Sequence, residues 1–552
     1  MTPEQLSSAI VSALGRMAAD GVIGRGELPE TVVVERPKNR DHGDWATNVA
    51  MQLAKKFEMT PRDFASLLAG HLEALESITK VEIAGPGFIN ITIATAASAS
   101  LINTILEEGD SFGSNQNLNG VKLNLEFVSA NPTGPIHLGG TRWAAVGDSL
   151  ARIFSFAGAE VTREYYFNDH GAQIDRFAKS LLASARNAAA PEDGYSGQYI
   201  DELAQQVLAE AAQDILGLED AAAQEAFRAA GVDLMFAQIR QSLHDFGVDF
   251  DVFFHENTLY QAGAVEKAIA QLTAKGHMFE QDGATWLRST SFGDDRDRVV
   301  IKSDGTTAYI AGDIAYYLDK RERGFDQCLY MLGADHHGYV QRMLAICAAF
   351  GDEPNLNMEI LIGQLVNLVR GGVPVKMSKR AGTVVTMEDL VDAVGVDAAR
   401  YSLTRSSINS SLDVDLEVLS KKTNDNPVFY VQYAHARTRQ VAKNAAAHFI
   451  ERVDFQAETL SHPSEENLLA QLAQFPKVVE TAVEFREPHR VARYLEELAG
   501  TYHRFYDNCR VVPLSGADLE PVHRARLWLN DACTQVLANG LDLLGVSAPE
   551  RM

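Results

Sequence analysis

Cysteine is scarce in this chain, and its placement argues against two classes of site. The 552 residues contain four cysteines that lie far apart: Cys328, Cys347, Cys509 and Cys533. They form neither a CxxC pair nor a Cys/His cluster with zinc-ligand spacing, so we expect no zinc and no other metal site. A disulfide framework is not indicated either, and a reduced cytoplasmic protein fits this cysteine usage best.

Long apolar runs and excess positive charge are also missing. The longest uncharged stretch, residues 83–106, contains glycine, proline and asparagine, and the first residues lack the regions of a signal peptide, so we expect no membrane partner. Acidic residues outnumber basic ones by 74 to 49, which gives a net charge of −25. A nucleic-acid partner would therefore need a local positive surface.

The composition that remains, 46% apolar and 22% charged, is that of a globular protein, and the length fits several domains. The pattern predicts a small α+β N-terminal domain over residues 1–115. An α/β domain with a doubly wound, mainly parallel, Rossmann-like sheet is expected over residues 116–400, with a largely helical insertion near residues 185–255. Apolar residues at helical spacing predict an all-helical domain over residues 401–552.

Strand-like runs interleaved with helical stretches carry the prediction of the parallel sheet. They lie at residues 121–127, 161–167, 298–301, 328–332 and 360–369.

The segment NPTGPIHLGG, residues 131–140, lies between a predicted strand and a predicted helix. A glycine-bearing turn at this place presents backbone N–H groups and the positive end of a helix to a phosphate. His137 in this turn could donate a hydrogen bond to a developing phosphoryl charge. Taken alone, the pattern is weak, because a turn histidine near glycines is more often structural or solvated.

A second candidate is the segment KMSKRAG, residues 376–382, which places two lysines and an arginine between glycines. Such a cationic loop could close over a triphosphate and stabilise the pyrophosphate leaving group. Alone it would be an ordinary basic turn, but together with the His137 segment it becomes much more specific. No Walker A loop and no dinucleotide fingerprint competes with this interpretation.

Both segments resemble signatures of class I aminoacyl-tRNA synthetases. FVSANPTGPIHLGGTRWAAVGD resembles their "HIGH" signature, and VKMSKRAG resembles their "KMSK" loop. Further segments resemble the arginyl-tRNA synthetase family in particular: YYFNDHGAQI, SDGTTAYIAGDIAYYLDK, GADHHGYVQRM and NDNPVFYVQYAHAR. ERPKNRDHGDWATNVA is similar to the family's N-terminal accessory domain, which contacts tRNA. The resemblance runs nearly end to end and is weakest between residues 185 and 250.

This resemblance implies an arginine–tRNA ligase. Such an AMP-forming enzyme uses ATP, with Mg²⁺, to convert L-arginine to arginyl-adenylate and transfers the arginyl group to the 3′ end of tRNA(Arg). We expect a cytoplasmic monomer whose partners are tRNA(Arg), L-arginine and ATP. Two alternatives stay open: a class I ligase for another amino acid, such as cysteine or glutamate, and a non-catalytic tRNA-binding relative. A cysteine ligase would need a thiol-selecting metal site, and a pure binding protein would not need the second loop.

The positions that match the family's motifs imply roles residue by residue. Catalytic roles fall to His137, Lys376 and Lys379. ATP-binding roles fall to Ala130, Asn131, Pro132, Thr133, Gly134, Pro135, Ile136, His137, Leu138, Gly139, Gly140, His336, His337, Met377 and Ser378.

The resemblance also implies an arginine pocket made by Glu126, Asn131, Asn168, Tyr309 and Asp313. A guanidinium needs planar, bidentate acceptors, which carboxylates and amides supply. If a helix begins at Tyr309, the i, i+4 spacing puts Tyr309 and Asp313 on one face of it.

The family's tRNA-binding helix matches a stretch that interleaves aromatic and basic residues: Tyr430, Tyr433, Arg437, Arg439 and Lys443. Stacking on unpaired bases combined with phosphate contacts would suit an anticodon loop. The other interpretation is an ordinary amphipathic helix.

One position departs from the family signature, because Gly140 stands where the second histidine is expected. Either His137 and backbone amides suffice for the phosphates, or His336 or His337 supplies the missing donor.

Overall fold

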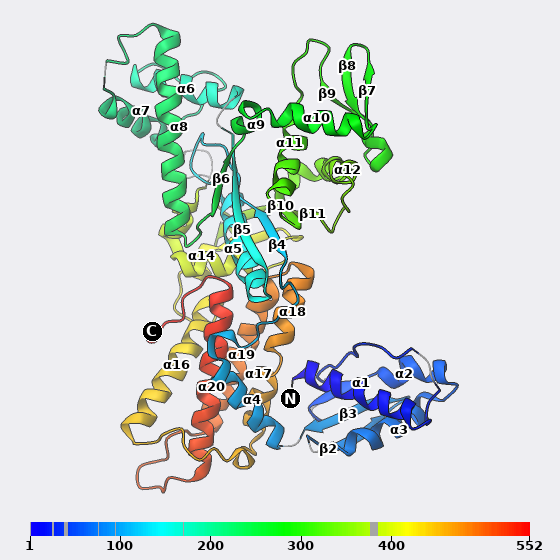
Figure 1. The fold of residues 1–552 in the computed structure, drawn as a ribbon. Coiled ribbons are helices and arrows are strands. Elements are labelled where there is room, and N and C mark those ends of the chain that lie inside the picture. Colours follow the sequence, from blue (N-terminus) through cyan, green and yellow to red (C-terminus); the bar gives the residue numbers. More distant parts are fainter. Residues whose placement is uncertain are drawn as a thin grey trace.

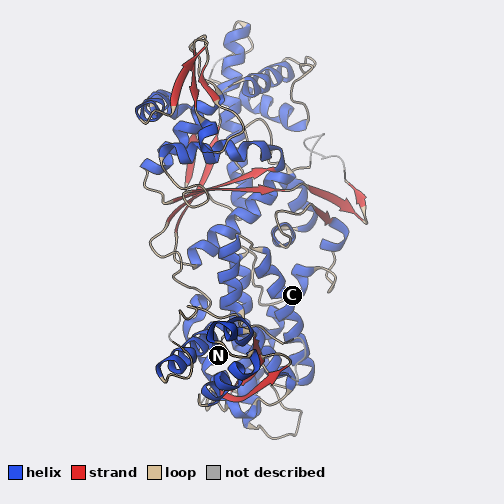
Figure 2. Cartoon of the chain, turned by 90° about the vertical axis from the view of Figure 1, so that its right-hand side faces the viewer, coloured by secondary structure: helices blue, strands red, loops and turns tan. Residues whose placement is uncertain are grey.

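The computed structural model describes residues 2–24, 27–37, 42–75, 77–93, 95–168, 171–212, 214–375 and 385–552. Figures 1 and 2 show an elongated molecule with the α/β part at one end, a helical bundle at the other, and the N-terminal part beside the bundle.

The N-terminal part is a small α+β unit, as predicted. It contains α1 (Pro3–Ala19), β1 (Trp45–Thr47), α2 (Val49–Leu53), α3 (Pro61–Glu73), β2 (Ile78–Ala84) and β3 (Phe88–Ile93). The three strands form an antiparallel sheet of order β1-β3-β2. The next helix, α4 (Thr95–Glu108), leaves this unit and packs against the helical bundle.

A five-stranded sheet forms the centre of the α/β part. Its order is β11-β10-β4-β5-β6, and every neighbouring pair is parallel. The strands are β4 (Lys122–Glu126), β5 (Glu160–Phe167), β6 (Val252–His255), β10 (Gln327–Gly333) and β11 (Met358–Gly363). The flanking helices are α5 (Leu138–Phe156), α11 (Tyr309–Glu322) and α12 (Val340–Phe350). The chain leaves β4 toward β5 and later returns on its other side as β10, which creates a topological switch point where ligands bind in such sheets.

Two excursions leave the sheet. The first is helical, with α6 (Ala172–Ala185), α7 (Gln198–Glu210) and α8 (Asp220–Asp245) packed on one another. The second contains α9 (Asn257–Gln261), α10 (Ala264–Ala274) and an antiparallel sheet of β7 (Met278–Gln281), β8 (Ala284–Leu287) and β9 (Arg298–Ile301).

A third small sheet joins β12 (Val366–Arg370), β13 (Val373–Pro374) and β14 (Leu412–Asp415), and the helices α13 (Met387–Val394), α14 (Val396–Thr404) and α15 (Leu416–Leu419) accompany it. Strand β14 lies within the range predicted to be all helical. It pairs with β12 in parallel, so the helical bundle proper starts after it.

The bundle is made of α16 (Pro427–Ala447), α17 (Pro463–Leu472), α18 (Phe475–Phe485), α19 (His489–Asn508) and α20 (Pro521–Leu543). The apolar stripes expected from the sequence face its interior: Leu468, Leu472, Leu495, Leu498, Val536 and Leu537 are fully buried. Short 3₁₀ helices occur at Ala54–Phe57, Gly109–Ser111, Ser289–Phe292, Ala334–Tyr339 and Ala457–Thr459.

Arg400 joins the bundle to the central α/β part of the molecule. Its side chain is fully buried, and Nη2 lies 2.5 Å from Asp148 Oδ2 on α5. The same guanidinium donates to the backbone carbonyls of Phe246, Gly247 and Leu544. Three segments far apart in the sequence therefore meet on one buried cation.

Candidate active site

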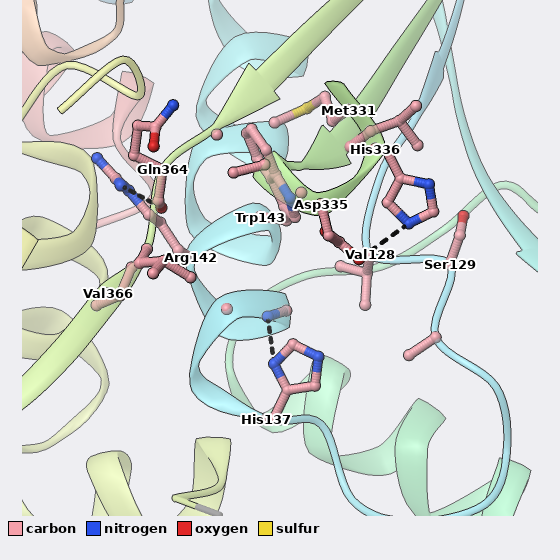
Figure 3. Close-up of a pocket in the computed structure, with 18 of the residues that line it drawn as sticks. Val128, Ser129, His137, Arg142, Trp143, Met331, Asp335, His336, Gln364 and Val366 are labelled. Carbon is pink, nitrogen blue, oxygen red and sulfur yellow. Dashed lines mark hydrogen bonds and ion pairs between the residues drawn. The ribbon is translucent and has the colours of Figure 1, made fainter. Parts of the chain in front are cut away.

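A cavity of about 1310 Å³ opens at the carboxyl ends of β4 and β10, at the switch point of the sheet. Its walls come from the turn after β4, the start of α5, the first turns of α11, the end of β10 and the segment between β11 and β12. Figure 3 shows several of these side chains. The predicted ATP and arginine segments thus meet around one space.

His137 is the N-cap of α5 and lines the cavity. The Gly140 N–H donates to His137 Nδ1 at 3.2 Å, so this nitrogen acts as an acceptor and the proton of the neutral ring is on Nε2. Burial lowers the pKa of His137, and Asp335 opposes this only in part. His137 is therefore a neutral imidazole with Nε2–H as its donor.

The turn before α5 is paired with the segment that follows residues 376–384. The Leu138 N–H donates to the Val385 carbonyl at 3.0 Å, and the Met387 N–H donates to the Ile136 carbonyl at 2.8 Å. His137 and Thr386 form an antiparallel bridge between these hydrogen bonds. The N–H groups of Leu138 and Gly140 thus already donate hydrogen bonds within the protein. Fewer backbone amides of this turn are therefore available to bind a phosphate. Lys376, Met377, Ser378 and Lys379 lie outside the described residues.

The position of Gly140 leaves little room for a side chain. A Cβ built there would lie 2.8 Å from Cγ2 of Ile136, closer than real Cβ contacts allow. Of the two histidines considered as substitutes for the missing donor, His336 lines the cavity and pairs with Asp335 at 3.4 Å, as Figure 3 shows, whereas His337 is not among the lining residues.

The expected arginine pocket is largely assembled. Glu126, Asn168, Tyr309 and Asp313 all line the cavity, and Tyr309 and Asp313 lie in the first turns of α11 as their spacing predicts. Tyr309 is 93% exposed, so its ring is open to the cavity mouth in the free protein. Burial raises the pKa of Asp313 to about 6, against a hydrogen bond from the Tyr339 hydroxyl.

The backbone after β4 is strained where it enters the site. Val128 has φ 68° and Ser129 has φ 43°, in the left-handed region that a β-branched residue rarely adopts. Ser129 Oγ accepts from the Tyr166 N–H at 3.0 Å, and the Tyr165 hydroxyl donates to the Ala130 carbonyl at 2.7 Å. These bonds from β5 hold the turn in a conformation that the chain alone disfavours.

The next residues of the turn contact the helical excursion instead of the cavity. Asn131 Nδ2 donates to Gln173 Oε1 at 2.6 Å, and the Tyr199 hydroxyl of α7 donates to the Thr133 carbonyl at 3.0 Å. The structure therefore places part of the predicted ATP-binding set beside the cavity and not on its wall: Asn131, Pro132, Thr133, Gly134, Pro135 and Ile136.

Sequence reasoning missed several residues that line the cavity: Trp143, Glu256, Met331, Tyr339, Arg342 and Gln364. Tyr339 and Arg342 lie in the quoted GADHHGYVQRM segment, which was a usable signal. Trp143 lies in the quoted FVSANPTGPIHLGGTRWAAVGD segment, which was a usable signal too, although the helix pattern alone does not distinguish it from a core residue.

Among the residues that the structure describes, no group of three or more His, Cys, Asp or Glu side chains could hold a metal ion. Within the same part of the chain, no helix is both long enough and apolar enough to cross a membrane.

On α16 the five predicted tRNA-binding residues fall into two groups. Arg437 donates to the Tyr433 hydroxyl at 2.9 Å and stacks over the rings of Tyr433 and Tyr506, with Tyr430 beside His503. Burial and Arg437 lower the pKa of His503 to about 4, so its Nδ1 can accept from Arg437 at 3.2 Å.

The second group pairs with the end of the chain. Arg439 and Lys443 lie 2.7 Å and 3.1 Å from the two carboxylate oxygens of Glu550.

A doubly wound parallel sheet with His137 at the start of a helix beside its switch point, followed by a helical bundle, is the layout of a class I aminoacyl-tRNA synthetase. The family model for the class I (R) tRNA synthetase catalytic domain matches residues 101–438. The models for the arginyl tRNA synthetase N terminal domain and the DALR anticodon binding domain match residues 4–93 and 431–552.

Individual relatives agree with these matches. The chain is 63% identical over 555 residues to an arginine–tRNA ligase of Kineococcus radiotolerans, and 62% identical over 554 residues to one of Clavibacter sepedonicus, with 100% of each chain covered in both cases. The arginyl-tRNA synthetase structure from Thermus thermophilus has the same fold, with a TM-score of 0.76, 24% identity and 100% coverage of both chains. The chain belongs to the arginyl-tRNA synthetase family.

Proposed function

We propose that this cavity activates L-arginine with ATP and then transfers the arginyl group to tRNA(Arg). The observation that carries the proposal is the meeting of two chemistries in one space. His137, a neutral donor, and Asp313 and Glu126, acceptors for a cation, all line the same cavity. A site that joins a cationic amino acid to a nucleotide needs both.

In the first step the arginine carboxylate attacks the α-phosphorus of ATP, and the bond to pyrophosphate breaks. This in-line displacement needs positioning and charge stabilisation, not a protein nucleophile. His137 Nε2–H would donate to a phosphate oxygen as charge develops there. Lys376 and Lys379 would stabilise the leaving pyrophosphate, and Mg²⁺ would arrive with the ATP.

Arginine would be held by its cationic groups. Asp313 and Glu126 would accept from the guanidinium or the α-ammonium group, while Asn168 would add an amide acceptor. Tyr309 would close against the substrate from the cavity mouth. In the free protein Asn131 donates a hydrogen bond to Gln173. Its side chain would have to move away from Gln173 in order to contact arginine.

For the second step, a hydroxyl of the terminal adenosine attacks the carbonyl carbon of arginyl-adenylate and AMP leaves. The tRNA would be held at a distance by α16, where Tyr433 and Arg437 offer aromatic faces and a cation. We further propose that the protein acts as a monomer in the cytoplasm.

Charging of tRNA with each of the twenty amino acids, in the presence of ATP, tests the proposal. We expect arginine alone to be attached, with one AMP and one pyrophosphate released per arginyl-tRNA. Charging with cysteine or glutamate would favour another class I ligase. Tight tRNA binding without any charging would favour a non-catalytic relative, and elution of a dimer in size-exclusion chromatography would overturn the monomer.

A further inference from the structure

A buried lysine lies directly behind the arginine pocket. Lys320, on α11, is fully buried, and its Nζ lies 2.6 Å from Glu126 Oε2. The same ammonium lies 3.9 Å from the ring centre of Tyr330 and 4.4 Å from that of Tyr316. Burial of an ammonium group is unfavourable unless it is paired, so this charge is bound closely to one carboxylate.

Glu126 connects this lysine to the cavity. The Glu126 side chain is 10% exposed and lines the cavity, whereas Lys320 is not among the lining residues. The other carboxylate oxygen, Oε1, accepts from the Ser129 hydroxyl at 3.3 Å. Both oxygens are thus held from within the protein, and the carboxylate is oriented before a substrate enters.

A neighbouring carboxylate does not compete for this role. Glu164 Oε1 lies 3.9 Å from Lys320 Nζ, but Arg323 donates to both Glu164 oxygens at 2.6 Å and 2.9 Å. Glu164 also accepts from Asn124 at 3.0 Å and from the Tyr316 hydroxyl. Arg323 thus supplies the hydrogen bonds of Glu164, and Lys320 adds only a longer charge contact to it. The carboxylate within hydrogen-bond distance of Lys320 is that of Glu126.

We propose that Lys320 is a positioning residue for arginine recognition: it does not touch the substrate but fixes the Glu126 carboxylate in the orientation that receives a cationic group of arginine. The inference rests on the proposed function, in which Glu126 belongs to the arginine pocket. Lys320 and Asp313 share one face of α11, seven residues apart, so the same helix sets the place of both acidic groups.

The test compares arginine KM, ATP KM and kcat for tRNA charging in five proteins: wild type, Lys320→Met, Lys320→Arg, Glu126→Gln and the double variant Glu126→Gln/Lys320→Met. We expect Lys320→Met to raise the arginine KM by about tenfold or more while the ATP KM changes by less than about twofold. Lys320→Arg keeps a cation opposite Glu126 and should recover most of the loss.

The double variant is informative even if Lys320→Met folds poorly, because it leaves no lone buried charge. If Lys320 acts only through Glu126, the double variant has the arginine KM of Glu126→Gln within about twofold. A further rise in the double variant would overturn the proposal, as would an unchanged arginine KM in Lys320→Met.

Arg323→Met is the matched control. Arg323 is the C-cap of α11 and is partly exposed, and its substitution removes an ion pair with the buried Glu164, which does not line the cavity. We expect a lower melting temperature with an unchanged arginine KM. If Arg323→Met raises the arginine KM as much as Lys320→Met, the effect is general destabilisation and the proposal is wrong. A wild-type chain that does not charge with arginine would instead refute the proposed function itself.

Discussion

The ionisation of Asp313 offers a quantitative test of the arginine pocket. Burial raises its pKa to about 6, Glu256 and Glu126 add to this, and the Tyr339 hydroxyl and Arg342 oppose it. Below pH 6 the Asp313 carboxyl group is protonated in most molecules, and it then lacks the negative charge that pairs with a guanidinium. Arginine binding should therefore weaken as the pH falls through this value.

The size of the effect follows from the fraction ionised, which is about nine tenths at pH 7 and about one tenth at pH 5 for a pKa near 6. If only the ionised form binds, the Kd for arginine rises about tenfold between these two values. Arginine keeps both positive charges across this range. Burial lowers the pKa of His137, so this ring is protonated less than a free histidine at any pH in the range.

Isothermal titration calorimetry of arginine binding to the chain alone, from pH 5 to pH 7, measures this directly. The Asp313→Asn variant should bind arginine weakly and with no slope over the same range. A wild-type Kd that changes by less than about twofold, or a slope retained in Asp313→Asn, would refute the reasoning because another group would then control binding.

Three further outcomes are expected. Gly140→Ala should lower kcat for charging about tenfold, since its Cβ would displace Ile136 and the adjoining His137 cap. The kcat of Gly140→His should not exceed that of the wild type. A higher kcat on adding histidine would indicate a decayed site. Lys379→Ala should slow adenylate formation about 10²- to 10³-fold, measured by rapid quench, while tRNA binding, measured by filter binding, stays near normal. If adenylate formation and tRNA binding fell equally, the loop would be an RNA contact. Tyr433→Ala should weaken tRNA binding by about 1–3 kcal/mol and raise the tRNA KM alone; an unchanged tRNA KM would return α16 to a purely structural role.

The sequence pattern predicted the parallel sheet but not its limits. The run at residues 360–369 was interpreted as one strand, yet it divides between β11 and β12 of two different sheets. β11 ends at Gly363, where a Cβ would lie 2.3 Å from Trp143, and Gln364 and Leu365 separate it from β12. The strand at residues 298–301 belongs to the antiparallel sheet with β7 and β8 and not to the central one. Periodicity reports that a strand exists, whereas its partner is decided by tertiary contacts.

β6 was missed because residues 252–255 lie inside the segment interpreted as a helical insertion. The position of site residues could be predicted where they lie on one helix, as with Tyr309 and Asp313 in successive turns of α11. It was not predictable where distant segments meet. From sequence, a lysine such as Lys320 is expected to lie on the surface. Only the fold brings it to Glu126, which lies 194 residues earlier in the chain.

The buried guanidinium of Arg400 has a consequence for how truncated chains should be understood. Leu544, just beyond α20, caps Arg400, and a Cβ at Gly545 would lie 2.0 Å from Arg400 Nη2, so the last turn of the bundle fits closely over the cation. The partner of that cation, Asp148, lies on the helix that begins at His137. Removing the bundle would admit water to this ion pair and loosen α5. Such a fragment would lose adenylate formation for a reason unrelated to tRNA, and its inactivity would not locate an anticodon contact.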